Sequence, residues 1–214
     1  MSTTQSPRSG TRVRIIEVAL ELFSEQGYEK TSLREIADRL GVTKAALYYH
    51  FKTKDDIVHG IVETAGAPID ETIAWGEKQQ WSPQVRDELL TRFAAGMAER
   101  APLLRFFHDN QPALRDSPAG LEFKARMIQM VRLLHGPGAS FEDRLRATMA
   151  LFSVNSAFFL LKHDQEGDGT RLPPLDAQDC GRATTVDEAV AAALTVALEI
   201  AGRIEPRVGQ AHGV

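Results

Sequence analysis

The stretch GVTKAALYYHFKTK, residues 41–54, gathers aromatic and basic side chains without a single acidic residue. An aromatic cluster alone is typical of a packed core, and a basic run alone is typical of a solvated helix face. The two mixed in one short segment indicate a surface that meets something flat and anionic. The neighbouring sequence decides between these interpretations.

Two short helices are predicted on either side of Gly41. Residues 32–35, SLRE, have the form of a capping box, in which a hydroxyl caps the helix start and a glutamate reaches back to it. Thr43 is suited to cap the second helix, which ends near His50. The turn that joins two such short helices must be tight.

The spacing of three residues predicts a helix-turn-helix. This motif needs a small residue where its helices cross, a residue that tolerates the turn four positions later, and an apolar residue six beyond that. Ala37, Gly41 and Leu47 stand at these offsets. With Leu47 and Phe51 turned inward, the other faces of the second helix are exposed and suited to enter a major groove of DNA.

The residue types in this unit fit contacts to a duplex. The small side chain of Ala45 allows close approach to base edges, and Lys44 is able to reach a guanine or a phosphate. Phenol and imidazole rings donate to phosphate oxygens, and helix N-termini favour phosphate. The candidate DNA-binding residues are Ser32, Arg34, Thr43, Lys44, Ala45, Tyr48, Tyr49, His50 and Lys54.

Residues 31–37, 41–42 and 47–54 closely resemble the N-terminal domain of tetracycline-repressor (TetR) family regulators. The resemblance covers about residues 11–60, and beyond residue 65 only the general all-helical habit is similar. It implies a homodimer with DNA-binding heads on a helical ligand-binding body, and usually repression relieved by a small molecule. It also implies base or phosphate contacts from the same nine positions, with the base preference at Ala45 left open.

The charge distribution agrees with a local contact patch. Residues 1–60 carry a net charge of +1 and the remaining residues −5, within a total of −4 for the 214-residue chain. Phosphates would repel the acidic remainder, so contact with DNA is expected only near the N-terminus. Arg8, Arg12 and Arg14 form a basic arm for which a minor-groove contact and a solvated face are equally open.

Nearly all other segments predict helices, because sustained period-2 alternation is missing. The first helix is expected over residues 11–26 and a fourth from Thr53, which Gly66-Ala67-Pro68 ends or kinks. Further helices are expected to start after Ser82, Ser117, Ser140 and Thr185, with a loop over residues 164–184.

The predicted fold class is therefore all-α, with a three-helix DNA-binding domain and a helical ligand-binding and dimerisation domain. We expect a flexible N-terminal arm over residues 1–10 and the helix-turn-helix domain over residues 11–56. The effector-binding and dimerisation domain is expected over residues 57–205, followed by a flexible tail over residues 206–214.

The body is expected to pair with a second copy of the chain. Its two long C-terminal helices carry apolar stripes with small residues beside large ones, which favours a four-helix dimer interface. Monomer core remains the alternative for any one of these residues. The stripes are Leu145, Met149, Phe152, Ser153, Ser156, Phe159 and Leu160, and Val190, Leu194, Ala197, Leu198 and Ala201.

A medium-sized, largely apolar effector is expected among the middle helices. Asn155 is the most informative position, because an amide on an apolar helix needs a buried partner or offers a polar contact to a ligand. Most such side chains would otherwise serve the core. The candidate effector-binding residues are Trp75, Phe93, Met97, Phe106, Phe107, His108, Phe123, Met127, Asn155 and Phe159.

We predict no catalytic residue, metal or cofactor. His108-Asp109 and His163-Asp164 lack the further ligands of a metal phosphohydrolase, and the single cysteine, Cys180, has no activating base nearby. Neither a membrane-length apolar run nor a signal core is present, so we expect a cytoplasmic protein without membrane contact.

The sequence thus predicts a sequence-specific DNA-binding transcriptional regulator, in the form of a homodimeric repressor that a small-molecule effector releases from double-stranded operator DNA. An activator and a helical DNA-binding dimer without an effector are the alternatives. A helical enzyme with a vestigial head is a third class.

Overall fold

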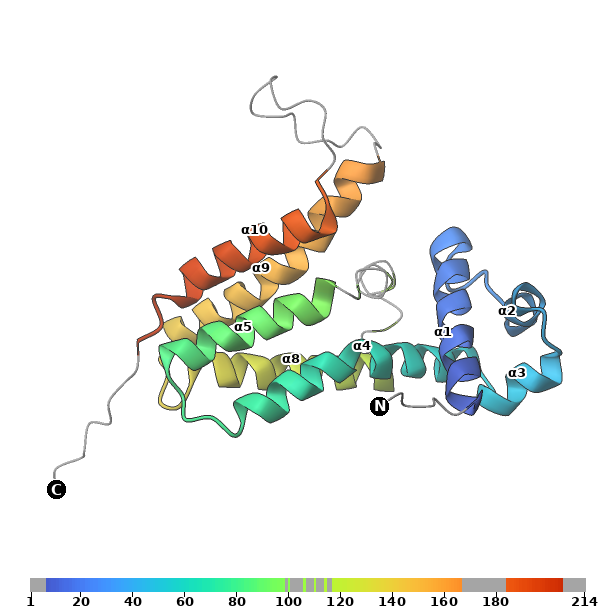
Figure 1. Cartoon of the computed structure of the whole chain (residues 1–214), viewed down its shortest axis with the longest axis horizontal. Coiled ribbons are helices and arrows are strands. Elements are labelled where there is room, and N and C mark those ends of the chain that lie inside the picture. Colours follow the sequence, from blue (N-terminus) through green and yellow to red (C-terminus); the bar gives the residue numbers. More distant parts are fainter. Residues whose placement is uncertain are drawn as a thin grey trace, which may run out of the picture. The chain divides into compact units, whose positions relative to one another are not determined.

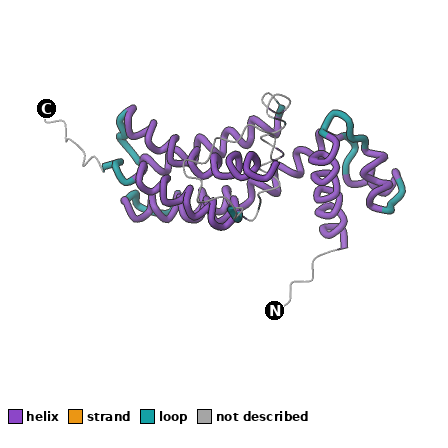
Figure 2. The backbone as a smooth tube through the Cα atoms, turned by 90° about the horizontal axis from the view of Figure 1, so that it is seen from above, coloured by secondary structure: helices purple, strands orange, loops and turns teal. Residues whose placement is uncertain are grey.

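The structure, a computed structural model, describes residues 7–98, 100, 106, 110, 114, 117–166 and 184–205. Every regular element in these residues is an α-helix, which confirms the predicted class (Figures 1 and 2). Labelled as in Figure 1, the helices are α1 (Pro7–Gln26), α2 (Leu33–Leu40), α3 (Lys44–His50), α4 (Lys54–Gly76), α5 (Pro83–Ala98), α8 (Pro118–His135), α9 (Phe141–Glu166) and α10 (Val186–Ala201). None of them combines the length and the apolar character that a membrane span requires.

The chain divides into two compact units. The first, which we call the head, comprises Met1–Gly66 and Phe106–Phe123, and the second, the body, comprises Ala67–Arg105 and Lys124–Val214. Helix α4 contributes residues to both units. The functional boundary drawn at residue 56 from the sequence stays a prediction.

Hydroxyl side chains fix where the body helices and α8 begin. The Ser82 hydroxyl accepts the Val85 amide, and the Ser117 hydroxyl accepts the Gly120 amide. Thr185 accepts the amide of Glu188, whose carboxylate in turn accepts the Thr185 amide in a capping box. These starts were predicted, because capping depends on residues only three positions apart.

Some helix limits differ from the sequence-based expectation. Helix α1 begins at Pro7 rather than at residue 11, since a proline at the first helical position loses no hydrogen bond. Pro68 does not end α4, which continues to Gly76. The expected loop over residues 164–184 lies mostly outside the described residues, and α9 extends to Glu166.

The head core consists of one apolar face from each of its helices. The side chains of Ile15, Phe23, Ile36 and Ile57 are all at most 3% exposed. On α1, Ile15 is buried, whereas Val13 is 45% exposed. The two positions are 200° apart around a helix, so Ile15 faces the core at this turn and Val13 faces outward.

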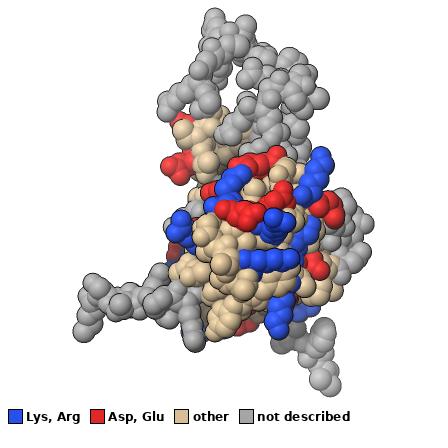
Figure 3. Space-filling view, turned by 90° about the vertical axis from the view of Figure 1, so that its right-hand side faces the viewer, with Lys and Arg blue, Asp and Glu red and all other residues tan. Residues whose placement is uncertain are grey.

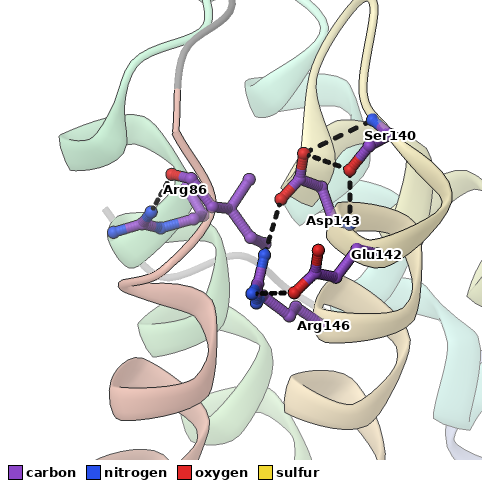
Figure 4. A network of polar contacts seen from close by, with 6 residues as sticks. Arg86, Ser140, Glu142, Asp143 and Arg146 are labelled. Carbon is purple, nitrogen blue, oxygen red and sulfur yellow. Dashed lines mark hydrogen bonds and ion pairs between the residues drawn. The ribbon is translucent and has the colours of Figure 1, made fainter.

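In the body, α9 and α10 run antiparallel side by side and α10 also contacts α5 (Figure 1). Arg86 of α5 is buried, and its Nη1 donates to the main-chain carbonyl of Ile204 at 3.0 Å (Figure 4). Its charge is compensated by Asp87, whose Oδ1 accepts from Nε at 2.8 Å. This charge-assisted bond fixes the end of the α10 segment on α5.

A second polar cluster lies at the start of α9. The Ser140 hydroxyl donates to the Asp143 carboxylate at 2.6 Å and accepts the Asp143 amide (Figure 4). Arg146 forms ion pairs with Asp143 and Glu142. The Ser140 hydrogen bond holds the pKa of Asp143 below its ordinary value, so the cap is charged near neutral pH.

Candidate nucleic-acid interface

The turn between α2 and α3 depends on a glycine in the left-handed conformation. Gly41 has φ 69° and ψ 28°, and its amide donates to the Asp38 carbonyl at 3.1 Å. The next amide, of Val42, donates to Ala37 at 3.0 Å, which completes a Schellman motif. An L-residue at this position would cost about 1–2 kcal/mol, because its Cβ atom is crowded in the left-handed conformation. The prediction for Gly41 is confirmed.

Helix α3 is held by residues on one side only. Leu47 is fully buried, Phe51 is 2% exposed, and Ala37 is 1% exposed where α2 packs on α3. A helix of seven residues is not stable alone in water, so this packing maintains it. The predicted inward face is therefore confirmed.

Both helices of the motif begin with an exposed hydroxyl cap. Ser32 Oγ accepts the Glu35 amide at 3.2 Å, and Glu35 Oε2 accepts the Ser32 amide at 2.7 Å. The bonds from Ser32 lower the pKa of Glu35. Thr43 Oγ1 accepts the Ala46 amide at 3.2 Å. Because each hydroxyl is the acceptor in its cap, its own proton is available for an anion.

The outer faces of α3 present the aromatic and basic groups of residues 41–54. Tyr49 is 69% exposed and Tyr48 is 38% exposed. Lys44 and Ala45 are exposed at the start of the helix, and Lys44 Nζ lies 5.3 Å from the centre of the Tyr48 ring. The Tyr49 ring lies edge-on to His50, with 5.3 Å between ring centres. These side chains are thus available to a partner that meets α3.

Two further candidate cations differ in their surroundings. The Arg34 side chain is 80% exposed, and its Nε lies 3.7 Å from Asp38 across one turn of α2. Lys54 is only partly exposed, and its Nζ donates to the carbonyls of Tyr28 at 2.8 Å and Glu29 at 3.3 Å. Arg34 is free to move toward a phosphate, whereas Lys54 is bonded within the head.

The charged surface of the head is not uniformly positive. In the view of Figure 3, lysine and arginine side chains are interspersed with acidic ones. Within the head, Arg39 pairs with Glu25 at 2.9 Å, and Arg12 pairs with Glu63 at 3.0 Å. The acid-free segment at α3 is therefore better suited to contact a polyanion than the head surface as a whole.

Tyr28, in the turn after α1, was not among the predicted site residues. Its hydroxyl donates to Asp55 Oδ1 at 2.6 Å, and its ring lies against Phe23 with 5.2 Å between centres. Burial raises the pKa of Tyr28 above its ordinary value, and the hydrogen bond to Asp55 raises it further. Nothing in the local sequence pairs Tyr28 with a residue 27 positions away.

The predicted effector-binding residues are distributed over both units. Phe93 and Met97 are buried in the body, where Met127 and Asn155 are half-buried and the Arg92 guanidinium lies 4.4 Å from the Trp75 ring centre. Phe106 and Phe123 belong to the head, and Phe106 stacks on Phe23 with 5.3 Å between ring centres. Phe107, His108 and the Phe159 side chain lie outside the described residues. The role of all ten candidate residues in ligand binding stays a prediction.

An apolar groove of about 410 Å³ lies along α9 and α10. Met149, Phe152 and Leu160, which the sequence placed in the dimer interface, line it and are 51–59% exposed. On α10, however, the predicted stripe is turned inward, since Val190, Ala197 and Ala201 are buried in the body. The groove instead includes Ala189, Ala192 and Val196.

The described residues contain no group of three or more His, Cys, Asp or Glu side chains arranged to hold a metal ion. The polar side chains at α3 are instead donors to anions. The geometry therefore supports recognition of a phosphate-bearing partner.

The raised pKa of Tyr28 predicts a specific alkaline weakening of the head. A phenol with a raised folded pKa stabilises the fold fully below its unfolded pKa of about 10, and this contribution is lost as pH rises above it. Thermal unfolding followed between pH 8 and 11.5 should show a smaller decline for Tyr28→Phe than for the wild type. Tyr49→Phe is the matched control, and an equal decline in all three proteins would contradict the prediction.

Comparison with known proteins assigns this head to a family. Residues 15–61 match the family described as bacterial regulatory proteins, tetR family. The regulator AcrR of Shigella flexneri is 47% identical over 68 residues, which cover 32% of this chain and 32% of AcrR. The repressor KstR2 of Rhodococcus jostii is 35% identical over 75 residues, which cover 33% of this chain and 37% of KstR2. The chain therefore spans about a third of the length of these curated relatives.

The similarity of fold extends beyond the head. A crystal structure of a TetR/AcrR-family transcriptional regulator from Thermobifida fusca superposes with a TM-score of 0.51 and 27% identity. The match covers 88% of this chain and 97% of the other. The matching family consists of regulatory proteins, so the match agrees with the expectation that the chain is not an enzyme. The helix-turn-helix head over residues 15–61 thus matches the tetR family of bacterial regulatory proteins, and the all-helical fold of the chain is similar to that of a TetR/AcrR-family regulator.

Proposed function

We propose that this protein is a sequence-specific DNA-binding transcriptional regulator that works as a homodimer in the cytoplasm. The observation that carries the proposal is the geometry of α3, which is anchored by Leu47 and Phe51 and exposes its remaining faces. A helix presented in this way fits the width of a DNA major groove. The family match of the head supports the same conclusion.

Different side chains of the head would have different tasks on the duplex. Lys44 and Ala45 occupy the first turn of α3, where they would meet base edges. The rings of Tyr48, Tyr49 and His50 would donate to phosphates. Ser32, Arg34 and Thr43 stand at helix starts, where main-chain amides and hydroxyl protons converge on an anion.

The apolar groove on the body supports homodimerisation. Phe141 and Leu145 extend the exposed apolar surface of α9 toward its start, beside Met149 and Phe152, at 50–74% exposure. Soluble monomers rarely leave such a contiguous apolar surface open to water. A second copy of the chain would cover it by an isologous contact between the two α9–α10 pairs. Two heads are also what DNA half-sites about 34–36 Å apart require.

The body between residues 57 and 205 is the proposed effector-binding and dimerisation domain. We infer a small, largely apolar effector from its aromatic and sulfur-bearing side chains, such as Phe93 and Met97. Effector binding would shift α4 and thereby the distance between two recognition helices. The name of the repressor KstR2 supports repression as the sign of regulation.

The DNA contacts predict two distinguishable mutant classes. Lys44→Ala should relax the preference at one base position by about 1–3 kcal/mol, because a base contact is lost. Tyr48→Phe should weaken binding about two- to tenfold for all sequences, because only a phosphate bond is lost. Fluorescence anisotropy with duplexes selected from a randomised pool measures both. Lys78→Ala in the body is the control, and equal behaviour of all three variants would exclude the assignment of α3 to the groove.

The dimer interface predicts a monomer when a charge enters the groove. Phe152→Glu should convert the protein from dimer to monomer, because two carboxylates would be desolvated at an apolar interface. Sedimentation velocity measures the change. Leu121→Glu, on an exposed face of α8 at 53% exposure, is the matched control and should remain dimeric. A dimeric Phe152→Glu protein would place the interface elsewhere.

A ligand-responsive repressor should lose operator affinity when its effector binds. A coupling free energy of about 1–3 kcal/mol corresponds to a change of about 5–150-fold. Compounds that raise the thermal stability of the body identify candidate effectors, and operator titrations with each compound measure the coupling. Operator affinity that is indifferent to every bound compound would favour a DNA-binding dimer without an effector.

A further inference from the structure

Lys54 occupies a position that its charge does not favour. It is the first residue of α4, where the helix dipole is positive and acidic side chains such as Asp55 and Asp56 are stabilising. The helix dipole therefore does not stabilise this lysine, and any favourable interaction of its charge must lie elsewhere. Its ammonium group has such an interaction in the turn that follows α1.

The ammonium of Lys54 binds the residues of that turn from two directions. Nζ donates to the carbonyl oxygens of Tyr28 and Glu29 at 2.8 and 3.3 Å. It also lies 4.4 Å from the centre of the Tyr28 ring, within the range of a cation–π interaction. The Tyr28 carbonyl also accepts the Thr31 amide at 3.3 Å, so the ammonium adds a charge-assisted bond to a carbonyl that already takes part in the turn.

Asp55, the next residue of α4, holds the same tyrosine by its other end. Its Oδ1 accepts the Tyr28 hydroxyl at 2.6 Å. Tyr28, Lys54 and Asp55 thus form a three-residue cluster, here called the clamp. Lys54 bonds to the Tyr28 carbonyl and lies against the Tyr28 ring, and Asp55 accepts the Tyr28 hydroxyl. The clamp therefore constrains the tyrosine at three points.

The clamp joins the two ends of the helix-turn-helix. Tyr28 lies four residues before the Ser32 cap of α2, and Lys54 lies four residues after His50, where α3 ends. Thr31, between Tyr28 and Ser32, is buried and its hydroxyl donates to the Gly27 carbonyl at 2.8 Å. The segment that enters α2 is therefore fixed to the segment that leaves α3.

We propose that Lys54 is a positioning residue, which acts on DNA by holding α2 and α3 in place through the clamp rather than by binding a phosphate. This inference rests on the proposed DNA-binding function and deepens it. It also replaces the assignment of Lys54 as a direct contact. The difference matters because a positioning residue changes affinity without changing the number of phosphates neutralised.

Salt dependence separates the two roles. Loss of a phosphate contact reduces the slope of log affinity against log salt concentration by about one unit per contact. Lys54→Met keeps the aliphatic part of the side chain and removes its charge and its donors. We expect this variant to bind the selected duplex about tenfold more weakly with an unchanged slope. Arg34→Gln is the matched control, which should flatten the slope.

The outcomes of the salt titration are decisive in either direction. A flattened slope for Lys54→Met would overturn the proposal in favour of a phosphate contact. Unchanged affinity would also overturn the proposal, because loss of a positioning residue must weaken binding. A side chain that only stabilises the fold has no effect on affinity far below the unfolding temperature. Should Lys54→Met fail to fold, Tyr28→Phe carries the test, because it breaks the bond to Asp55 and leaves every charge in place. Weaker binding by Tyr28→Phe at the same slope supports the clamp, and unaltered binding contradicts it.

Amide hydrogen exchange tests the clamp without DNA. Lys54→Met and Tyr28→Phe should lower the protection of amides in residues 31–50, whereas Arg34→Gln should leave it unchanged. Equal protection in all variants would contradict the proposal. If the wild-type protein selects no duplex, the proposed function fails, and the exchange comparison still decides whether the clamp holds the motif.

Discussion

The head depends on the burial of two apolar side chains from a segment too short to fold alone. Leu47 and Phe51 are almost completely inaccessible to water, and burial of two such groups contributes about 3–6 kcal/mol. That contribution offsets the unfavourable formation of a seven-residue helix. Because the anchors lie on one side, the polar and aromatic groups on the other sides are held outward. The same buried contact therefore anchors α3 and presents its polar and aromatic side chains to solvent.

Features set by neighbouring residues were predictable from the sequence. The caps at Ser32 and Thr43 and the glycine turn at Gly41 depend on residues within a few positions of one another, so their spacing is sufficient. The bonds of Lys54 to Tyr28 and Glu29 connect positions 25 and 26 residues apart, and no local pattern indicates them. The sequence therefore predicted a phosphate contact for this lysine and did not indicate that its ammonium is bonded within the head.

In the body, the sequence pattern does not predict which faces of the helices are exposed. Helix α10 is apolar on most of its circumference, so periodicity does not identify which face is covered by its own chain. Val190, Ala197 and Ala201 are buried within the body, where α10 packs on α9 and α5, and Val196 is left at the surface. On α9 the contrast between buried Ala150 and Val154 and exposed Phe152 is visible only once the neighbouring helices are in place. Tertiary packing, rather than composition, selects the open face.

The proline inside α4 is accommodated by a partner on another helix. A Cβ atom built on Gly96 of α5 would lie 2.8 Å from Cβ of Pro68, closer than two carbon atoms can approach. The rigid ring and the missing side chain therefore fit each other, and the Thr72 hydroxyl donates to the Pro68 carbonyl at 2.7 Å. The two positions therefore form an interlocked pair. A larger residue at position 96 would fit only if Pro68 were replaced by a residue with a smaller or more flexible side chain.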